Sequence, residues 1–452
     1  MSLKNKYPNV CVDLPKILLP NPNIELTEWA VVACDQFTSQ PDYWEEVAAT
    51  VEGLPSTLNM IFPEVYLGKG DDQSRIEQIH QSMQYYLNEG ILIEHDPSLI
   101  YVERRTNHGH LRRGLVLTVD LECYDYTPGS QTLIRATEGT VLERIPPRVK
   151  IRDGAVLESP HIMLLIDDPE CRVIEPLAKQ KDKLDQLYNF ELMMNGGSVA
   201  GYKINQPEIL ADIYQGLASL ADKDNFNRKY ELENREVLLF AVGDGNHSLA
   251  TAKAVWEKIK KEAANPSEIM NHPARYALVE VVNIHDQGLL FEPIHRVLFN
   301  VNEAEVIAVM KRYFESLGSE FSFEISDDAD SRIELFRREK PNSHVIKFYI
   351  AEKVGLIVIS KPSHNLEVGT LQAFIDAYLK EHTHTEVDYI HGAEVVADLG
   401  SHAGNMGFYL PVMSKSALFK TVIVDGVLPR KTFSMGEAEE KRYYLECRKI
   451  VV

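Results

Sequence analysis

One stretch near the middle of the chain constrains the fold most, because an apolar run, a turn with two glycines and a helix-forming segment follow one another there. Residues 238–242 are continuously apolar, which is typical of a strand covered on both faces. Gly243 and Gly245 follow, and glycine allows positive φ values and close approach of the backbone to another group. Residues 248–264 are rich in Ala, Lys and Glu and lack Gly and Pro, which favours a helix. The sequence therefore predicts a strand, a tight turn and a helix.

The predicted turn has the properties of an anion site. A glycine turn that opens a helix leaves backbone N–H groups free at the positive end of the helix dipole, which suits a phosphate or a carboxylate. Asp244, Asn246, His247 and Ser248 would surround such an anion. The alternative is an ordinary tight turn in which Asp and Asn cap the helix. The stretch matches neither the Walker A pattern nor the dinucleotide-binding fingerprint.

Length and charge narrow the class of protein. A chain of 452 residues with 44% hydrophobic and 25% charged residues is long enough for two or three globular domains. The formal net charge of −20 argues against non-specific binding to nucleic acid or to anionic membranes. The apolar runs are too short to cross a bilayer, and the first residues lack the pattern of a signal peptide. We expect no nucleic-acid and no membrane partner.

The number and spacing of the cysteines indicate the redox state of the protein's compartment. They are odd in number and contain no C-x-x-C pair: Cys11, Cys34, Cys123, Cys171 and Cys447. This scatter predicts free thiols in a reducing cytoplasm and no cysteine-based zinc site.

Local patterns predict a mixed α+β fold with several lobes. We divide the chain into an N-terminal mixed region (1–130), a central region with the anion-binding turn (131–300) and a C-terminal mixed region (301–452), which fold together. We expect strands at residues 29–34, 99–103, 111–119, 162–166, 276–284, 345–351, 354–359 and 420–424. We expect helices at residues 41–51, 74–88, 177–221 and 303–317, an acidic turn at 326–331, and a last helix opened by a capping box of Ser434 and Glu437.

Two further segments carry candidate chemistry. Residues 134–153 form a basic and irregular segment with several guanidinium groups, which bind phosphate and carboxylate in a bidentate way: Arg135, Arg144, Arg148 and Arg152. A solvated loop with surface ion pairs is the alternative. His295 and Arg296 stand side by side between apolar residues, which fits either a core histidine or part of a site.

A histidine-rich segment near the C-terminus leads to a separate hypothesis, a metal site. His382 and His384 have the H-x-H spacing that chelates a metal from one face of a strand, and His391, Glu394 and His402 follow. A metal-dependent hydrolase built on His382, His384 and His391 is therefore one of the alternatives.

Several motifs in a fixed order resemble a known family. They are 243–252 (G-D-G-N-H-S-L-A-T-A), Pro293-Ile294-His295-Arg296, Ser159-Pro160 before the strand at 162–166, and Lys431-Thr432. Over most of its length the chain resembles the uncharacterised bacterial and archaeal family catalogued as domain of unknown function 1015. The family has no established activity.

The D-G-x-H box itself is similar to the phosphate-binding box of the ParB/sulfiredoxin superfamily. There, a strand, a glycine-rich turn and a helix N-terminus hold nucleotide phosphates in sulfiredoxins, partition proteins and kinases of free serine. This sequence departs from the box, because Ser248 stands where the superfamily usually has Arg. Arg135, Arg144, Arg148 or Arg296 would then supply the positive charge.

Our first functional hypothesis is a nucleotide-dependent phosphotransferase or phosphohydrolase that acts on a small metabolite. In it, phosphate lies at Gly243, Gly245, Asn246 and Ser248, with ATP or ADP as the nucleotide. Asp244 binds Mg²⁺ or orients the accepting hydroxyl, and His247 acts as an acid, a base or a phosphate donor. Developing charge is neutralised by three residues outside the turn: His295, Arg296 and Lys431.

The second hypothesis, from another class, is a non-catalytic protein that binds a metabolite or a nucleotide and regulates a partner. The absence of the box arginine at Ser248 favours it. It predicts stabilisation by a ligand without turnover. A nucleic-acid-binding role ranks third, because the net charge and the lack of a basic stripe count against it.

Overall fold

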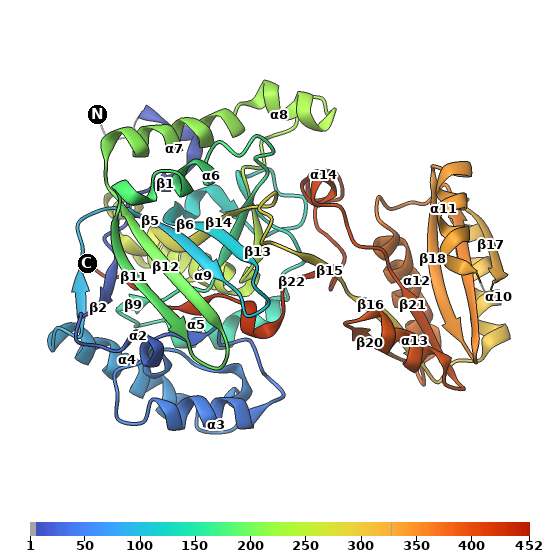
Figure 1. Cartoon of the computed structure of the whole chain (residues 1–452), viewed down its shortest axis with the longest axis horizontal. Helices are drawn as coiled ribbons and strands as arrows, with labels where there is room; N and C mark the ends of the chain where they lie inside the picture. The colour runs from blue at the N-terminus through green and yellow to red at the C-terminus, as the bar shows by residue number, and fades with distance from the viewer. Residues whose placement is uncertain (1–5, 327) are drawn as a thin grey trace. The chain divides into compact units, whose positions relative to one another are not determined.

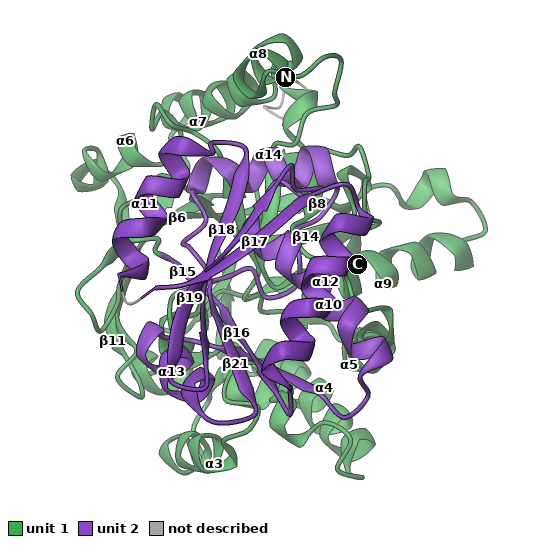
Figure 2. Ribbon diagram, turned by 90° about the vertical axis from the view of Figure 1, so that its right-hand side faces the viewer, with its two compact units in different colours: residues 1–290, 436–452 green, residues 291–435 purple. Residues whose placement is uncertain are grey.

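The computed structural model of the chain describes residues 6–326 and 328–452. Its contacts divide the chain into two compact units, which Figure 2 shows in different colours. Unit 1 comprises Met1–Leu290 and Gly436–Val452, and unit 2 comprises Phe291–Met435. Both units contain helices and sheets, so the predicted mixed α/β class is confirmed. The regions 1–130, 131–300 and 301–452 do not coincide with these units, and that they fold together stays a prediction.

A ten-stranded mixed sheet organises unit 1 (Figure 1). The strands of unit 1 are β1 (Val12–Asp13), β2 (Leu18–Pro20), β3 (Val31–Val32), β4 (Leu92–Glu94), β5 (Leu99–Arg105), β6 (Leu111–Asp120), β7 (Tyr124–Asp125), β8 (Ile134–Ala136), β9 (Leu157–Glu158), β10 (Met163–Ile166), β11 (Asp185–Leu192), β12 (Gly197–Ile204), β13 (Phe240–Asp244), β14 (Tyr276–Asn283), β23 (Tyr443–Tyr444) and β24 (Arg448–Lys449). The sheet has the order β11-β12-β5-β6-β14-β10-β13-β8-β7, with β1 paired to β6. β10 runs parallel to β14 and antiparallel to β13, so the predicted strands at 162–166 and 276–284 are neighbours. Strand β14 is buried along nearly its whole length, including Glu280, which forms a buried ion pair with Arg442.

The helices of unit 1 are α2 (Leu26–Trp29), α3 (Pro41–Thr50), α4 (Asp72–Asn88), α5 (Ile145–Arg152), α6 (Glu175–Ala178), α7 (Pro207–Leu220), α8 (Lys223–Tyr230) and α9 (Asn246–Glu262). Helix α5 packs beside α9. Apolar side chains from α3, α4 and the C-terminal segment form one core that includes Trp44, Ile79 and Tyr444. The last residues of the chain are therefore built into unit 1.

Unit 2 is a six-stranded sheet with helices on both faces, and a short β-ladder joins the ends of its segment. Its strands are β15 (Phe291–Pro293), β16 (His295–Phe299), β17 (Glu320–Ile325), β18 (Ser343–Ile350), β19 (Lys353–Ser360), β20 (Glu386–Ile390), β21 (Asn405–Tyr409) and β22 (Phe433–Met435). Its helices are α10 (Glu303–Ser316), α11 (Ala329–Glu339), α12 (Glu367–Glu381), α13 (Ala393–Ser401) and α14 (Lys415–Asp425). The sheet order is β17-β19-β18-β21-β16-β20, and β15 pairs with β22. The expected acidic turn at 326–331 lies partly outside the described residues.

The helices of unit 2 follow the alternation of its strands. Side chains of a strand point to opposite faces in turn. Ile346 and Phe348 pack with residues of α10 and α12, whereas Val345 packs with α11 and Tyr349 with α13. The apolar hairpin predicted at 345–359 is confirmed, and it is buried on both faces because helices cover both.

The predicted helical stretch 177–221 is wrong over half of its length. It contains the antiparallel hairpin of β11 and β12, and only α7 is a long helix. The hairpin turns at Met194 and Asn195, both of which have positive φ, and its strands alternate in burial. Pairing with β5 stabilises β12 as a strand, and such a long-range contact overrides local helix propensity.

Three other local predictions are also wrong. Residues 420–424, predicted as a strand, lie inside α14, because a short apolar run is compatible with a buried helix as well. Ser434 lies in β22 and opens no helix; the capping box joins Glu437 to Glu440 in a single 3-10 turn. Of the strand expected at 29–34, only β3 forms, because Trp29 ends α2.

Cys11 and Cys123 form a disulfide, which contradicts the expected free thiols. Pairing of β1 with β6 brings residue 11 next to the end of β6, and Cys123 ends the 3-10 turn that follows this strand. No spacing in the sequence reveals this pairing, because 112 positions separate the two cysteines. The remaining cysteines, Cys34, Cys171 and Cys447, are free thiols. Within the described residues, every helix is too short or too polar to traverse a lipid bilayer.

Candidate functional site

The predicted strand, turn and helix are present in unit 1. Strand β13 ends at Asp244, Gly245 forms the turn with φ +78°, and α9 begins at Asn246. A Cβ atom at Gly245 would lie 3.0 Å from the Cα atom of Ile162, so the turn packs directly against the chain that enters β10. Glycine is needed here both for the backbone angle and for this close approach. Helix α9 starts without a side-chain cap and without an acidic residue in its first turn.

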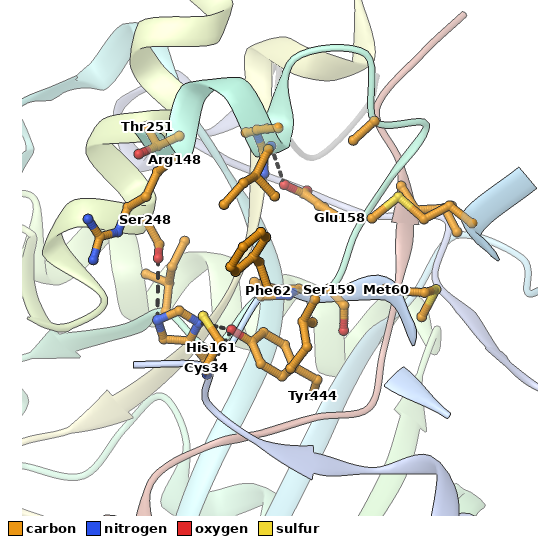
Figure 3. A pocket seen from close by; sticks show the side chains of 18 of the residues that line it. Cys34, Met60, Phe62, Arg148, Glu158, Ser159, His161, Ser248, Thr251 and Tyr444 are labelled. Carbon is orange, nitrogen blue, oxygen red and sulfur yellow. Dashed lines mark hydrogen bonds and ion pairs between the residues drawn. The ribbon is translucent and has the colours of Figure 1, made fainter. Parts of the chain in front are cut away.

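A cavity of about 150 Å³ opens at the first turn of α9 (Figure 3). Its polar lining comes from segments far apart in the sequence: Cys34, Glu64, Arg148, Arg152, Glu158, Ser159, His161, Ser248, Thr251 and Tyr444. Its apolar lining comes mainly from Met60, Ile61, Phe62, Leu67, Met83, Ile151, Leu157 and Ile162. A large apolar wall with a few convergent polar groups is the usual character of a small-molecule site.

Three side chains form a hydrogen-bonded row at the polar end of the cavity (Figure 3). The Ser248 hydroxyl lies 3.3 Å from Nε2 of His161, and the Tyr444 hydroxyl lies 2.7 Å from Nδ1 of the same ring. His161 is only 5% exposed. Strand β23 pairs with β3, which places Tyr444 beside Cys34, and the backbone N–H of Cys34 donates to the Tyr444 hydroxyl. Both ring nitrogens of His161 therefore have a hydrogen-bond partner.

Asp35 adds a negative charge to this row. Its Oδ2 atom lies 3.8 Å from Nε2 of His161. Burial opposes its ionisation, but the charges of His161 and Lys441 and the hydrogen bond from Gln36 outweigh burial and lower the pKa of Asp35. The carboxylate is therefore ionised and faces the imidazole.

The other groups near the cavity are held uncharged or paired. Burial, assisted by the charge of Asp35, raises the pKa of the Cys34 thiol, so this thiol stays protonated. Arg148 forms an ion pair with Glu64 and also donates to the carbonyl of Arg144. At the far side of the cavity, Arg152 pairs with Glu158 at 2.5 Å.

Asp244 and His247 have partners of their own. Oδ1 of Asp244 accepts a hydrogen bond from the backbone N–H of Gly245 at 2.9 Å, and Oδ2 lies 3.3 Å from Nζ of Lys441. Nε2 of His247 accepts from the backbone N–H of Val141. Burial, with the nearby charges of Arg148 and Arg144, lowers the pKa of His247 to about 4, so its ring is neutral at pH 7. Their catalytic and metal-binding roles stay predictions.

Of the remaining turn residues, Ser248 lines the cavity, and Gly243 lies in β13 as part of the strand. Among the described residues, the buried Oδ1 atom of Asn246 has no hydrogen-bond partner. Such an atom is a position where a ligand or a water completes the hydrogen bonding.

The arginines of the basic segment are divided between two roles. Segment 134–153 contains β8 and α5 and is more regular than its composition indicates. Arg135 is buried, and its guanidinium donates to the carbonyl oxygens of Thr132, Glu236 and Val237. Arg148 and Arg152, both from α5, line the cavity, and Arg152 lies at its far side in an ion pair with Glu158. Phosphate binding by Arg135 stays a prediction.

His295, Arg296 and Lys431 belong to unit 2. Nδ1 of His295 accepts from the backbone N–H of Leu410, and burial together with Arg296 lowers the pKa of His295 to about 4. Arg296 is fully buried and donates to the carbonyls of Ile294 and Arg430. Their part in a phosphate site stays a prediction.

The residues that the structure describes contain no group of three or more His, Cys, Asp or Glu side chains able to hold a metal ion. His382 instead stacks on Tyr378 and pairs with Glu305. The proposed H-x-H chelate is therefore not assembled among these side chains.

Sequence reasoning missed His161, Tyr444 and Asp35. No sequence motif links these residues to Ser248. The separation between Ser248 and His161, for example, is 87 positions. One signal was present: His161 directly follows the Ser159-Pro160 pair that carries part of the family resemblance.

Comparison with known sequences identifies the family. The profile described as "Protein of unknown function (DUF1015)" matches residues 16–378. The chain belongs to this family. This range includes β13, α9 and most of the cavity, but it ends before Tyr444 and Lys441. No curated protein sequence matches the chain.

Several solved structures are similar over most of the chain at low identity. A free serine kinase mutant in complex with AMP is 10% identical with a TM-score of 0.37, covering 74% of this chain and 91% of that one. A conserved hypothetical protein from Pyrococcus furiosus is 11% identical with a TM-score of 0.34, covering 73% and 90%. SbnI with a C-terminal truncation, from Staphylococcus aureus, is 10% identical with a TM-score of 0.34, covering 71% and 83%.

Proposed function

We propose that unit 1 binds a small phosphorylated metabolite or a nucleotide in the cavity at the start of α9, and transfers or hydrolyses its phosphoryl group. The observation that carries this proposal is the position of Ser248. Its hydroxyl projects from the first turn of α9 into a cavity that also contains His161 and Arg148. The first N–H groups of a helix have no intrahelical partner and attract phosphate.

The two ends of such a ligand would contact different parts of the lining, one polar and one apolar. The phosphate end faces Ser248, His161 and the guanidinium of Arg148, and the organic end contacts the side chains around Phe62 and Met83. The negative charge of Asp35 works against an anion here, and Lys441, which acts on Asp35, offsets part of it. The formal net charge of −20 supports a small ligand rather than nucleic acid, and we place the activity in the cytoplasm.

The roles of the turn residues follow from their surroundings. His247, neutral at pH 7, is suited to accept or donate a proton. Asp244 would orient an accepting hydroxyl, or bind Mg²⁺ together with phosphate oxygens and waters, once it exchanges Lys441 for that partner. Two classes of phosphoryl donor are proposed, a nucleotide (ATP or ADP) and a small phosphate monoester.

A thermal-unfolding panel with the full chain tests this proposal. The ligands are ATP, ADP, AMP, CTP and GTP, each with and without Mg²⁺, and inorganic phosphate. A ligand at 100 times its Kd adds about 2.7 kcal/mol to the stability of the folded state, which is easily seen as a rise in Tm. Gly245→Val should abolish the rise, and Gly53→Val, at a similar φ in open space, should keep it. A flat panel contradicts the proposal.

A second candidate function is ligand binding without chemistry. Both carboxylate oxygens of Asp244 are occupied by Gly245 and Lys441, and the box arginine is replaced by Ser248, which favours this alternative. It predicts the same thermal stabilisation without release of phosphate or product. Asp244→Asn distinguishes the two, since it should end turnover in an enzyme and leave binding intact.

A further inference from the structure

The cavity offers four hydroxyl or thiol groups besides Tyr444; two of them are engaged in hydrogen bonds, and a third is a thiol that stays protonated. The Thr251 hydroxyl donates to the carbonyl of His247 at 2.7 Å, and the Ser159 hydroxyl donates to the carbonyl of Glu446 at 3.0 Å. The Cys34 thiol stays protonated. Of these four groups, Ser248 is the one whose hydroxyl faces a ring nitrogen.

The row of Ser248, His161 and Tyr444 has the features of an activated nucleophile. A nucleophilic hydroxyl needs a base within hydrogen-bond reach, and that base needs a third group to orient it. Nε2 of His161 lies 3.3 Å from the hydroxyl, within hydrogen-bond reach. The Tyr444 hydroxyl at 2.7 Å from Nδ1 fixes the orientation of the ring, and in the tautomer that carries its proton on Nδ1 the Nε2 atom is free to accept the serine proton. Asp35 stabilises the imidazolium that results.

The position of Ser248 also suits a phosphorylated side chain. Ser248 is the third residue of α9, and a phosphate at a helix N-terminus is stabilised by the helix dipole and the free N–H groups. The first turn of α9 carries no acidic residue that would oppose this charge. The same turn that is proposed to hold a ligand's phosphate would therefore hold a phosphoserine.

We infer that Ser248 is a nucleophile that takes the phosphoryl group of the ligand and forms a phosphoserine intermediate, with His161 as its base. The inference rests on the proposed function and assigns its covalent step. The Ser248 oxygen forms a bond to phosphorus, and its proton passes to Nε2 of His161. The bond from phosphorus to the leaving oxygen breaks, and His161 gives that oxygen the proton. Water or an acceptor hydroxyl then attacks phosphorus, gives its proton to His161, and Ser248 leaves with the proton restored.

The apolar wall sets the chemical class of the donor. The whole cavity has a volume of about 150 Å³, close to that of a cavity that holds benzene, so the apolar part beside the phosphate accommodates only a compact group. The leaving group is therefore a compact apolar or aromatic alcohol, and the donor is its phosphate monoester. p-Nitrophenyl phosphate has this chemistry, and its leaving group is coloured.

Rapid mixing of the full chain with p-nitrophenyl phosphate, followed by acid quenching, tests the inference. We expect a burst of about one p-nitrophenolate per chain and a phosphate that survives acid and maps to Ser248 by peptide mass spectrometry. Phosphoserine is stable in acid whereas phosphohistidine is not. An acid-labile phosphate would assign the step to a histidine such as His247 and overturn the inference.

Three variants and one control separate the roles. Ser248→Ala should lose the burst and the label, and Ser267→Ala, which changes an exposed serine beyond the end of α9, should keep both. His161→Gln should slow the burst by about 100-fold or more, the usual contribution of a general base. Tyr444→Phe, at a positioning residue, should lower the burst rate constant and leave the half-saturating substrate concentration unchanged. An equal rise in that concentration would indicate a structural role instead.

The inference and the proposed function fail in different ways. If nucleotides or phosphate stabilise the protein but no acid-stable label forms on Ser248, the proposed binding stands and the nucleophile is wrong. If the panel is flat and p-nitrophenyl phosphate gives no burst, both fail. Mapping the label in the unmodified chain decides the matter even where a variant does not fold.

Discussion

The Tyr444 hydroxyl lies 2.7 Å from Nδ1 of His161, and 283 positions separate the two residues. Pairing of β23 with β3 brings the C-terminal segment back into unit 1 and sets this contact. The side chains of both residues are buried, so neither has water as a substitute partner. A buried polar group that loses its partner is costly, because its desolvation is no longer compensated.

Tyr444→Phe should therefore destabilise unit 1 by about 1–3 kcal/mol, measured by urea unfolding. Tyr124→Phe is the matched control. Among the described residues, the Tyr124 hydroxyl is buried and has no hydrogen-bond partner, so its removal should cost nothing measurable. Equal losses in both variants would mean that the contact with His161 adds no stability.

Gly245→Ala should destabilise the turn through two effects. A residue with a side chain at φ +78° costs about 1–2 kcal/mol, and the new Cβ atom would press on Ile162. Gly53→Ala isolates the first effect, because Gly53 has φ +74° and no atom within 4 Å of the new Cβ. The loss in Tm should be clearly larger for Gly245→Ala. An equal loss would show that the contact with Ile162 relaxes freely.

Gly114→Ala should destabilise the core of unit 1. The new Cβ atom would overlap the carboxylate of Glu280, which forms a buried ion pair with Arg442. Displacing one partner of a buried pair costs about 3–5 kcal/mol. Gly139→Ala, where no atom lies within 4 Å of the new Cβ, is the control and should leave Tm nearly unchanged.

The stability of unit 1 should fall as the pH drops from about 6.5 towards 4. His247 has its pKa lowered from 6.5 to about 4 in the folded chain, so in this window the unfolded chain binds a proton that the folded chain does not. Stability rises with pH wherever the unfolded state binds more protons. Urea unfolding at several pH values measures this slope, and His247→Asn should flatten it. A slope unchanged in that variant would assign the effect to other groups.

Local pattern predicts the parts of this molecule that local chemistry determines. The turn at Gly245 and the start of α9 follow from two glycines and a helix-forming run, and both are present. The hairpin of β11 and β12 escapes prediction, because its strand form depends on pairing with β5 rather than on its own residues.

The same distinction between local sequence and long-range pairing applies to the residues of the site. Ser248 is found by sequence because it lies in the turn itself. His161, Asp35 and Tyr444 reach Ser248 through β10, β3 and β23, and only the order of the strands brings them together. Asp244, the residue with the strongest catalytic pattern, instead pairs with Lys441, whose place 197 positions further on no local pattern indicates.

The most direct test of the account locates the ligand on the chain. Hydrogen–deuterium exchange, with and without the strongest ligand of the thermal panel, reports which backbone amides become protected. We expect protection at residues 245–251, at the start of α9, and at residues 148–162, which line the cavity. Protection confined to other parts of the chain, with residues 245–251 unchanged, would contradict the placement of phosphate at this turn.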